Sequence, residues 1–248
     1  PWTQWPLPLR TRNGKALAKK RKELHEEVDY YIFLQMIFFE QWKQLSKYAK
    51  EQGVSIIGDI PIYVAMDSAD TWANPELFQL DAQCRPTAVA GCPPDAFTAD
   101  GQLWGNPLYR WDVMARDGYQ WWLDRIRASL ELFDAVRIDH FRGFESYYAI
   151  PYGEVTAKNG KWVKGPGKGL IAAIKQSFPN VQIIAEDLGF LTQEVKELLS
   201  YSGFPGMKII QFAFDSREKS DYIPFKYSRN CVVYTGTHDN ETTLGWIE

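Results

Sequence analysis

The chain has 248 residues, of which 45% are hydrophobic and 15% aromatic, and its formal net charge is −3. This length suffices for one large domain or two small ones, and the hydrophobic fraction is enough for a sizeable core. The charge gives no sign of nucleic-acid or membrane binding, so we expect no nucleic-acid partner and no membrane association. Most of the 10 Trp and 13 Tyr must belong to the core. Because aromatic rings stack on the apolar faces of sugars, roughly a quarter of them could line a cleft.

Helical and strand patterns alternate along the chain. Helices are predicted over residues 15–52, where Gly53 ends the pattern, over 117–133 and 170–178, and from the N-cap Thr192 onward. Short apolar runs predict buried strands over residues 54–60, 135–139, 181–186, 207–214 and 231–237. Residues 61–106 are expected to form a long loop that is functional or contains short elements, and residues 147–169 a polar, Gly-rich excursion. This order of elements predicts an α/β protein with a parallel sheet.

The three cysteines are Cys84, Cys92 and Cys231. Their odd number and irregular spacing argue against a disulfide framework. No secretory signal begins the chain, and the densest apolar run, residues 28–39, is too short to span a bilayer. We therefore expect a cytoplasmic location. Because the chain begins at Pro1 and stops nine residues after Asp239, we interpret it as a piece of a longer protein.

Three carboxylates follow the apolar runs, namely Asp139, Glu186 and Asp239. The carboxyl ends of parallel barrel strands are where active sites of this architecture are built. Two acids and a third carboxylate are what cleavage of a glycosidic bond with retention requires. The three acids are therefore the predicted catalytic residues.

Each acid also has a structural interpretation. Arg137 lies two residues before Asp139, on the same strand face, where a cation favours the ionised form of a nucleophile. The pair could equally close the strand end as a structural ion pair, and Asp59, after another apolar run, could join it. Glu186 would need a raised pKa to act as a general acid, which burial or the charges of Asp139 and Asp187 could provide. Alternatively, Glu186 and Asp187 are acids at a helix N-terminus.

The remaining polar segments are also ambiguous. His238 and Asp239 could bind sugar hydroxyls, or could belong to a segment that caps a helix starting at Thr242. Trp104 lies on a predicted rigid turn over residues 101–107 and could serve as a lid, as a sugar platform or as the anchor of a long loop. His140, His238 and the acids lack a recognisable metal-ligand spacing, so we expect no metal and no cofactor.

Several segments together resemble the amylomaltases, the 4-α-glucanotransferase or disproportionating-enzyme family, which are relatives of the α-amylases. The resemblance covers about residues 33–246. The segments are Ile56-Ile-Gly-Asp-Ile-Pro-Ile-Tyr-Val64, Val89-Ala-Gly-Cys-Pro-Pro-Asp95, Gly101-Gln-Leu-Trp-Gly-Asn-Pro-Leu-Tyr-Arg-Trp111, Val136-Arg-Ile-Asp-His-Phe-Arg-Gly-Phe144, Ile184-Ala-Glu-Asp-Leu-Gly189, Pro205-Gly-Met-Lys208 and Tyr234-Thr-Gly-Thr-His-Asp-Asn240.

The resemblance implies a (β/α)₈ TIM barrel, of which the chain would contain only the third to seventh βα units. We expect residues 1–248 to form one catalytic barrel domain with an active-site loop insertion around residues 65–110. The resemblance also implies that Asp139 is the nucleophile, Glu186 the acid/base and Asp239 the transition-state stabiliser. The implied substrate-binding and orienting residues are Asp59, Tyr63, Trp104, Asn106, Arg137, His140 and His238, with Pro93, Pro94 and Trp104 in the loop over the acceptor side.

The expected activity is the transfer of α-1,4-glucan segments by a retaining double displacement. The expected partners are α-1,4-glucans: maltooligosaccharides, amylose, glycogen or starch. The main alternative is a hydrolase of the α-amylase or debranching type with the same carboxylates. A glucan-binding module without activity and a purely structural α/β domain are further alternatives, which the joint presence of three strand-end acids disfavours.

Overall fold

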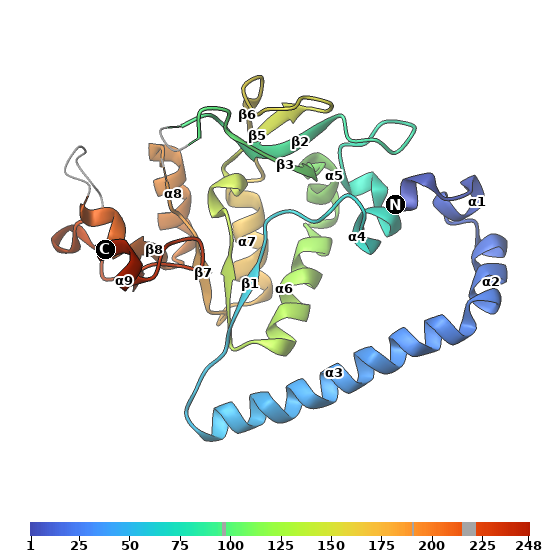
Figure 1. Ribbon diagram of the computed structural model, residues 1–248, viewed down its shortest axis with the longest axis horizontal. Helices are drawn as coiled ribbons and strands as arrows, with labels where there is room; N and C mark the ends of the chain where they lie inside the picture. Colours follow the sequence, from blue (N-terminus) through green and yellow to red (C-terminus); the bar gives the residue numbers. More distant parts are fainter. Residues whose placement is uncertain (96–97, 190, 215–221) are drawn as a thin grey trace.

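The computed structural model describes residues 1–95, 98–189, 191–214 and 222–248, and its centre is a parallel sheet (Figure 1). This sheet has the order β1 (Ile57–Ile60), β4 (Ala135–Ile138), β7 (Ile183–Ala185). A second parallel pair consists of β8 (Gly206–Ile209) and β9 (Cys231–Tyr234). The backbone N–H of Ala185 donates to the Pro205 carbonyl at 2.9 Å, which places the start of β8 beside β7. The predicted α/β fold with parallel strands is confirmed.

Helices α6 (Gln120–Leu132), α7 (Lys168–Ser177) and α8 (Gln193–Ser202) lie beside the parallel strands (Figure 1). Their apolar side chains pack with the inner residues of β4 and β7 in the main core, for example Trp122 and Ile174 with Val136. The side chain of Thr192 accepts a hydrogen bond from the Val195 N–H, so the predicted cap of α8 is confirmed. The sheet positions that face away from this core carry the candidate site.

The predicted helical region 15–52 is two helices, α2 (Gly14–Glu23) and α3 (His25–Glu51), and Gly53 follows with a φ of 71°. Helix α3 runs along the bottom of the view and approaches the body near its carboxyl end (Figure 1). There the indole N–H of Trp42 donates to the Leu132 carbonyl at 2.8 Å. Most of the apolar face of α3 is exposed. Within the described part of the chain, no helix is long and apolar enough to cross a membrane.

A four-stranded antiparallel sheet lies beyond the carboxyl ends of β1 and β4, at the top of Figure 1. Its order is β3 (Gln102–Pro107), β2 (Ala88–Cys92), β5 (Ser146–Pro151), β6 (Lys161–Lys164). The expectation that residues 61–106 are functional or contain short elements agrees with the presence of β2 and the start of β3 there. The polar excursion predicted over residues 147–169 is wrong where the chain forms β5 and β6. The inserted region also contains the short helices α4 (Ala69–Ala73) and η2 (Pro75–Leu77). The predicted turn over residues 101–107 is largely strand β3.

The strand predicted over residues 207–214 is also wrong beyond Ile209. There β8 gives way to a 3₁₀ helix, η5 (Ile210–Phe214), which an apolar run alone cannot distinguish from a strand. Within this helix, the side-chain amide of Gln211 donates to the Glu241 carbonyl at 3.0 Å, and its backbone N–H donates to the Thr235 carbonyl at 3.2 Å. The remaining short helices are η1 (Trp2–Gln4), α1 (Leu7–Arg10), α5 (Trp111–Met114), η3 (Ala115–Asp117), η4 (Phe141–Phe144), η6 (Pro224–Lys226) and α9 (Thr243–Ile247).

Candidate active site

Arg137 lies between two carboxylates on the face of the parallel sheet opposite the helices. The register of β1 and β4 places Asp59 beside Arg137. Nη1 of Arg137 donates to both carboxylate oxygens of Asp59, at 2.8 and 2.7 Å, and Nη2 donates to Oδ1 of Asp139 at 2.7 Å. The Arg137 side chain is only 14% exposed, whereas that of Asp139 is 44% exposed. Two charge-assisted contacts thus fix the guanidinium, and the guanidinium in turn orients a carboxylate that solvent or a ligand can reach.

Glu186 follows β7 directly and continues its pairing with β4. Its backbone N–H donates to the Ile138 carbonyl at 3.0 Å. The two oxygens of its side chain accept backbone N–H bonds, one from His140 and one from Leu188, each at 2.7 Å. Burial raises the pKa of Glu186 to about 7, and the negative charge of Asp139 also raises this pKa, while the two N–H groups lower it. A carboxyl with a pKa near 7 can both give and take a proton at neutral pH.

Asp187 has a different role from its neighbour. It is 3% exposed, its Oδ1 accepts the Met207 N–H at 2.6 Å, and its Oδ2 lies 3.6 Å from Nζ of Lys208. Asp187 therefore connects the end of β7 to β8. The carboxylate whose charge raises the pKa of Glu186 is that of Asp139. Helix α8 begins only at Gln193, so Glu186 and Asp187 are not the first-turn acids of a helix.

An aromatic side chain from the antiparallel sheet reaches the residue after Asp139. The ring of Trp104, on β3, meets the ring of His140 edge-on at a centroid distance of 4.9 Å, and Tyr63 lies 6.2 Å from Trp104. His140 has a left-handed backbone with a φ of 53°, and its buried Nε2 has no hydrogen-bond partner among the described residues. Burial, assisted by the charge of Arg142, lowers the pKa of His140 to about 4. The imidazole is therefore neutral at pH 7.

Asn106 lies on the same strand as Trp104, and its side-chain amide donates to the Val64 carbonyl at 3.0 Å. This bond ties β3 to the segment after β1, which includes Tyr63. Trp104 is 36% exposed and its indole N–H bonds only locally, to Gln102 at 2.9 Å. The Trp104 ring is thus partly exposed, and it does not serve only to anchor β3 to the rest of the protein.

His238 and Asp239 follow β9, and within the described part of the chain their ion pair is with each other. Their side chains are 74% and 76% exposed, and Nε2 of His238 lies 3.5 Å from Oδ1 of Asp239. The side chain of Asn240 accepts from the Thr237 N–H at 2.8 Å and closes the turn that displays them. Helix α9 does begin after the cap Thr242, as the structural interpretation of this segment predicted. Among the described residues, no hydrogen bond or ion pair joins Asp239 to Asp139 or Glu186.

Sequence reasoning missed two residues that support the site. The thioether of Met207 lies 3.3 Å from Nε of Arg137, so β8 also contacts the central guanidinium. Gln211 holds the segment after β9 through its bond to Glu241. A lone amide inside the apolar run 207–214 was the available signal for Gln211. In the sequence, a methionine within an apolar run, such as Met207, cannot be distinguished from a residue of the hydrophobic core.

The chain is similar in sequence and in structure to known proteins. The sequence model of the family described as 4-alpha-glucanotransferase matches residues 1–248. The chain is 52% identical over 248 residues to a 4-alpha-glucanotransferase of Clostridium butyricum, covering 100% of this chain and 51% of that protein. It is 54% identical over 248 residues to a 4-alpha-glucanotransferase of Thermus thermophilus, covering 99% of this chain and 50% of that protein.

Among solved structures, the amylomaltase from Streptococcus agalactiae in complex with acarbose matches with a TM-score of 0.95 and 44% identity. The match covers 99% of this chain and 50% of the amylomaltase chain. The chain thus spans about half the length of the relatives that it matches. Because the family model matches the whole of residues 1–248, the chain belongs to the 4-alpha-glucanotransferase family.

Proposed function

We propose that the protein that carries this chain transfers segments of α-1,4-glucan between maltooligosaccharides, amylose, glycogen or starch, with retention of configuration. The observation that carries the proposal is that Asp139 and Glu186, two neighbouring acids, lie in different surroundings. Asp139 is held by Arg137 at 2.7 Å, whereas burial raises the pKa of Glu186 to about 7. A retaining glycosidase mechanism uses one carboxyl that is oriented as the nucleophile and a second that gives and takes a proton. Membership of the family and the likeness to an amylomaltase in complex with acarbose support the substrate class.

The reaction has two steps with Asp139 and Glu186 in fixed roles. The Asp139 carboxylate attacks the anomeric carbon while the bond to the leaving 4-oxygen breaks, and Glu186 gives its proton to that oxygen. The 4-hydroxyl of an acceptor glucan then loses its proton to Glu186 and attacks the same carbon, and the bond to Asp139 breaks. This mechanism requires the two carboxyls to lie about 5–5.5 Å apart, and a separation of roughly 6.5–9.5 Å would indicate inversion.

The other site residues are assigned to binding and orientation. Asp59 and Arg137 orient Asp139, and Asp239 binds sugar hydroxyls more strongly as the positive charge grows at the anomeric carbon. The neutral imidazole of His140, whose buried Nε2 lacks a partner in the described chain, offers a hydrogen bond to a sugar hydroxyl.

A second group of residues binds sugar rings and covers the acceptor side. His238 binds hydroxyls beside Asp239, while Tyr63, Trp104 and Asn106 form an aromatic and polar wall on the same side as His140. Pro93, Pro94 and Trp104 shield the intermediate from water until a sugar acceptor arrives.

We further infer that β1, β4, β7, β8 and β9 are the third to seventh strands of a (β/α)₈ barrel, so that residues 1–248 form one catalytic domain with an insertion around residues 65–110. The strands follow one another in chain order, as in such a barrel. Helix α3 exposes large apolar side chains, such as Tyr31, Phe33 and Phe39, which are 66%, 52% and 48% exposed. A face of this kind is normally covered. Since the relatives are about twice as long, the other barrel units are its proposed cover.

The first experiment incubates the full-length protein with maltotriose, alongside its Asp139→Asn variant, and separates the products. Free glucose together with a ladder of longer and shorter glucans, abolished in Asp139→Asn, is the expected result. Shortening alone would indicate a hydrolase of the α-amylase or debranching type, and no product would favour a binding module.

The cytoplasmic location remains a prediction, and the names of two plant relatives place those proteins in the chloroplast or amyloplast.

A further inference from the structure

The short helix η4 and the residue before it hold Glu186 through two backbone hydrogen bonds. The His140 N–H donates to the Glu186 side chain at 2.7 Å, and the Phe141 N–H donates to the Glu186 carbonyl at 3.0 Å. The position of the Glu186 carboxyl therefore depends on the position of η4. Any group that fixes η4 also contributes to the placement and the hydrogen bonding of this carboxyl.

The segment that ends β6, in the antiparallel sheet, lies against the other end of η4. The Gly165 N–H donates to the Glu145 carbonyl at 2.8 Å, and the Gly167 N–H donates to the Phe144 carbonyl at 2.7 Å. Lys164, the last residue of β6, pairs with the Glu145 carboxylate. A Cβ added to Gly165 would lie 2.5 Å from the Phe144 carbonyl oxygen, so the two backbones are in close contact. Helix η4 is thus held between the two sheets.

A side-chain contact also joins β6 to η4, because the guanidinium of Arg142 lies over the ring of Trp162. The guanidinium carbon is 3.9 Å from the ring centroid, well inside the distance of about 6 Å within which an aromatic face attracts a cation. A planar guanidinium is suited to stacking on a ring. Arg142 is only 9% exposed, whereas Trp162 is 41% exposed. The indole therefore covers a largely buried cation of η4.

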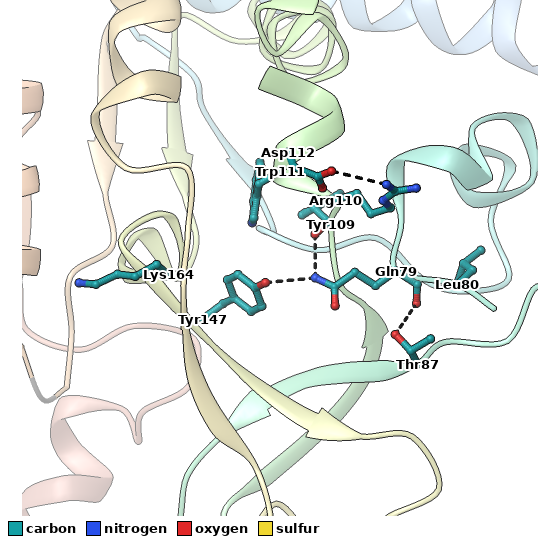
Figure 2. A pocket seen from close by; sticks show the side chains of 9 residues that line it. All are labelled: Gln79, Leu80, Thr87, Tyr109, Arg110, Trp111, Asp112, Tyr147 and Lys164. Atoms are coloured by element: carbon teal, nitrogen blue, oxygen red, sulfur yellow. Dashed lines mark hydrogen bonds and ion pairs between the residues drawn. The ribbon is translucent and has the colours of Figure 1, made fainter. Parts of the chain in front are cut away.

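Neighbouring residues of the antiparallel sheet support the ring of Trp162. The register of β5 and β6 places Trp162 opposite Tyr148, and the two rings meet edge-on at a centroid distance of 5.2 Å. The Tyr148 hydroxyl donates in turn to the Ala157 carbonyl at 3.1 Å. Strand β5 is anchored to the inserted segment, since Nε2 of Gln79 donates to the Tyr147 hydroxyl at 3.1 Å, as Figure 2 shows. The sheet therefore presents the indole to η4 from a fixed support.

We propose that Trp162 is a positioning residue for the reaction: by stacking on Arg142 it fixes η4, and η4 in turn holds Glu186. The proposal rests on the proposed function for the role of Glu186 as the acid/base. The alternative is that the stack stabilises the fold and has no effect on Glu186. The two differ in what a substitution of Trp162 does to the Glu186 carboxyl.

The effect on Glu186 has a defined sign. The His140 N–H donates to the carboxylate and lowers its pKa, whereas burial raises this pKa. If η4 is less well fixed, the bond from His140 weakens and the pKa of Glu186 rises. The charged and titratable groups that interact with Glu186 are unchanged by a substitution in β6, namely Asp139, Arg137 and Cys92.

The test compares three variants of the stack with one control, all in the full-length protein. Trp162→Leu keeps an apolar side chain but removes the ring, and Trp162→Tyr keeps a ring. Arg142→Lys keeps the positive charge but removes the planar group. The matched control is Trp5→Leu, because Trp5 is 45% exposed, close to the 41% of Trp162, and its ring meets that of Trp72 in α4 instead.

Trp162→Leu and Arg142→Lys should each raise the pKa of Glu186, followed by carbon NMR of selectively labelled protein. The expected rise is about 0.5–1, which is part of the effect of losing one hydrogen bond to a carboxylate. At pH 6, where Glu186 is mostly protonated, kcat/KM for maltotriose should fall about 10-fold because the acid is less well placed. Trp162→Tyr should restore most of both properties, since a tyrosine ring also attracts a cation. Trp5→Leu should match the wild type.

The NMR titration needs no activity, so it tests the placement of Glu186 even if the wild type makes no transfer product and the proposed function fails. A Glu186 pKa that stays at the wild-type value in both Trp162→Leu and Arg142→Lys would overturn the positioning role. An equal rise in Trp162→Tyr or in Trp5→Leu would also overturn it, because the effect would then not depend on the stack. In each of these cases an active wild type leaves the proposed function intact.

Discussion

Glu186 should set the upper pH limit of the proposed glucan transfer. Burial is the largest cause of the rise of its pKa from 4.5 to about 7, and Asp139 contributes in the same direction. A difference of this size corresponds to roughly 3 kcal/mol between the two protonation states. Because the proposed general acid must carry its proton in the first step, the wild-type kcat/KM for maltotriose should reach a plateau as the pH is lowered from 7 to 6. Above pH 7 it should fall about tenfold per pH unit.

Replacing Asp139 by Asn isolates the contribution of the neighbouring charge. The variant is expected to be inactive, so the Glu186 carboxyl is followed by carbon NMR of selectively labelled protein. We expect its pKa to fall below the wild-type value and to stay above 4.5, because burial, the larger cause, is unchanged. A wild-type profile that stays flat to pH 9, or a Glu186 pKa near 4.5 in the wild type, would refute the reasoning.

The same shift has a consequence for stability. A carboxyl whose pKa is raised in the folded state binds its proton more tightly there than in the unfolded chain. Its contribution is therefore fully present below pH 4.5 and is lost as the pH rises to about 7. Denaturant titrations of wild type and Glu186→Gln should show that the wild type alone loses up to about 3 kcal/mol from this group between these pH values.

Three further substitutions test other parts of the site. Trp104→Ala should raise the ratio of hydrolysis to transfer measured with maltotriose, because water then reaches the glycosyl intermediate, and an unchanged ratio would contradict the shielding role. Gly58→Ala should lower the free energy of unfolding by about 1–3 kcal/mol in denaturant titrations, since an added Cβ would lie 2.0 Å from the ring of Phe133. Asp239→Asn should reduce kcat about 100-fold or more and change stability by less than about 0.5 kcal/mol, because its side chain is 76% exposed. A large loss of stability in that variant would instead indicate a structural role.

The parallel part of the fold was predictable because its strands are short, apolar and bounded by polar residues. Strands β1, β4, β7 and β9 all lie within the predicted runs. Helix α6 lies within its predicted range, α8 starts directly after the predicted cap Thr192, and α7 begins two residues before the predicted helix 170–178. The antiparallel sheet was not predictable in this way. Strand β2 pairs with β5, whose residues lie about 60 positions further along the chain, so the hydrogen bonds that define both strands are invisible in either local segment.

The site was predictable where it depends on strand-end position and unpredictable where it depends on tertiary contacts. The spacing of Arg137 and Asp139 indicated their ion pair, and the pair is observed. The raised pKa of Glu186 was expected from its role. Its bond from the His140 N–H, however, comes from a residue with a left-handed backbone, which the sequence does not display. The contact between Trp104 and His140 likewise requires the antiparallel sheet to fold over the ends of the parallel strands.

The carboxyl end of β4 contacts both acids, while burial is the main cause of the raised pKa of Glu186. Arg137 fixes Asp139 through its guanidinium, while the next residue, His140, turns into the left-handed region and donates its N–H to Glu186. A shift of this segment would change the position of Asp139 and the hydrogen bonding of Glu186 together. The division of roles therefore depends on the burial of Glu186 together with the contact of Arg137 to Asp139, and the residue types alone do not determine it.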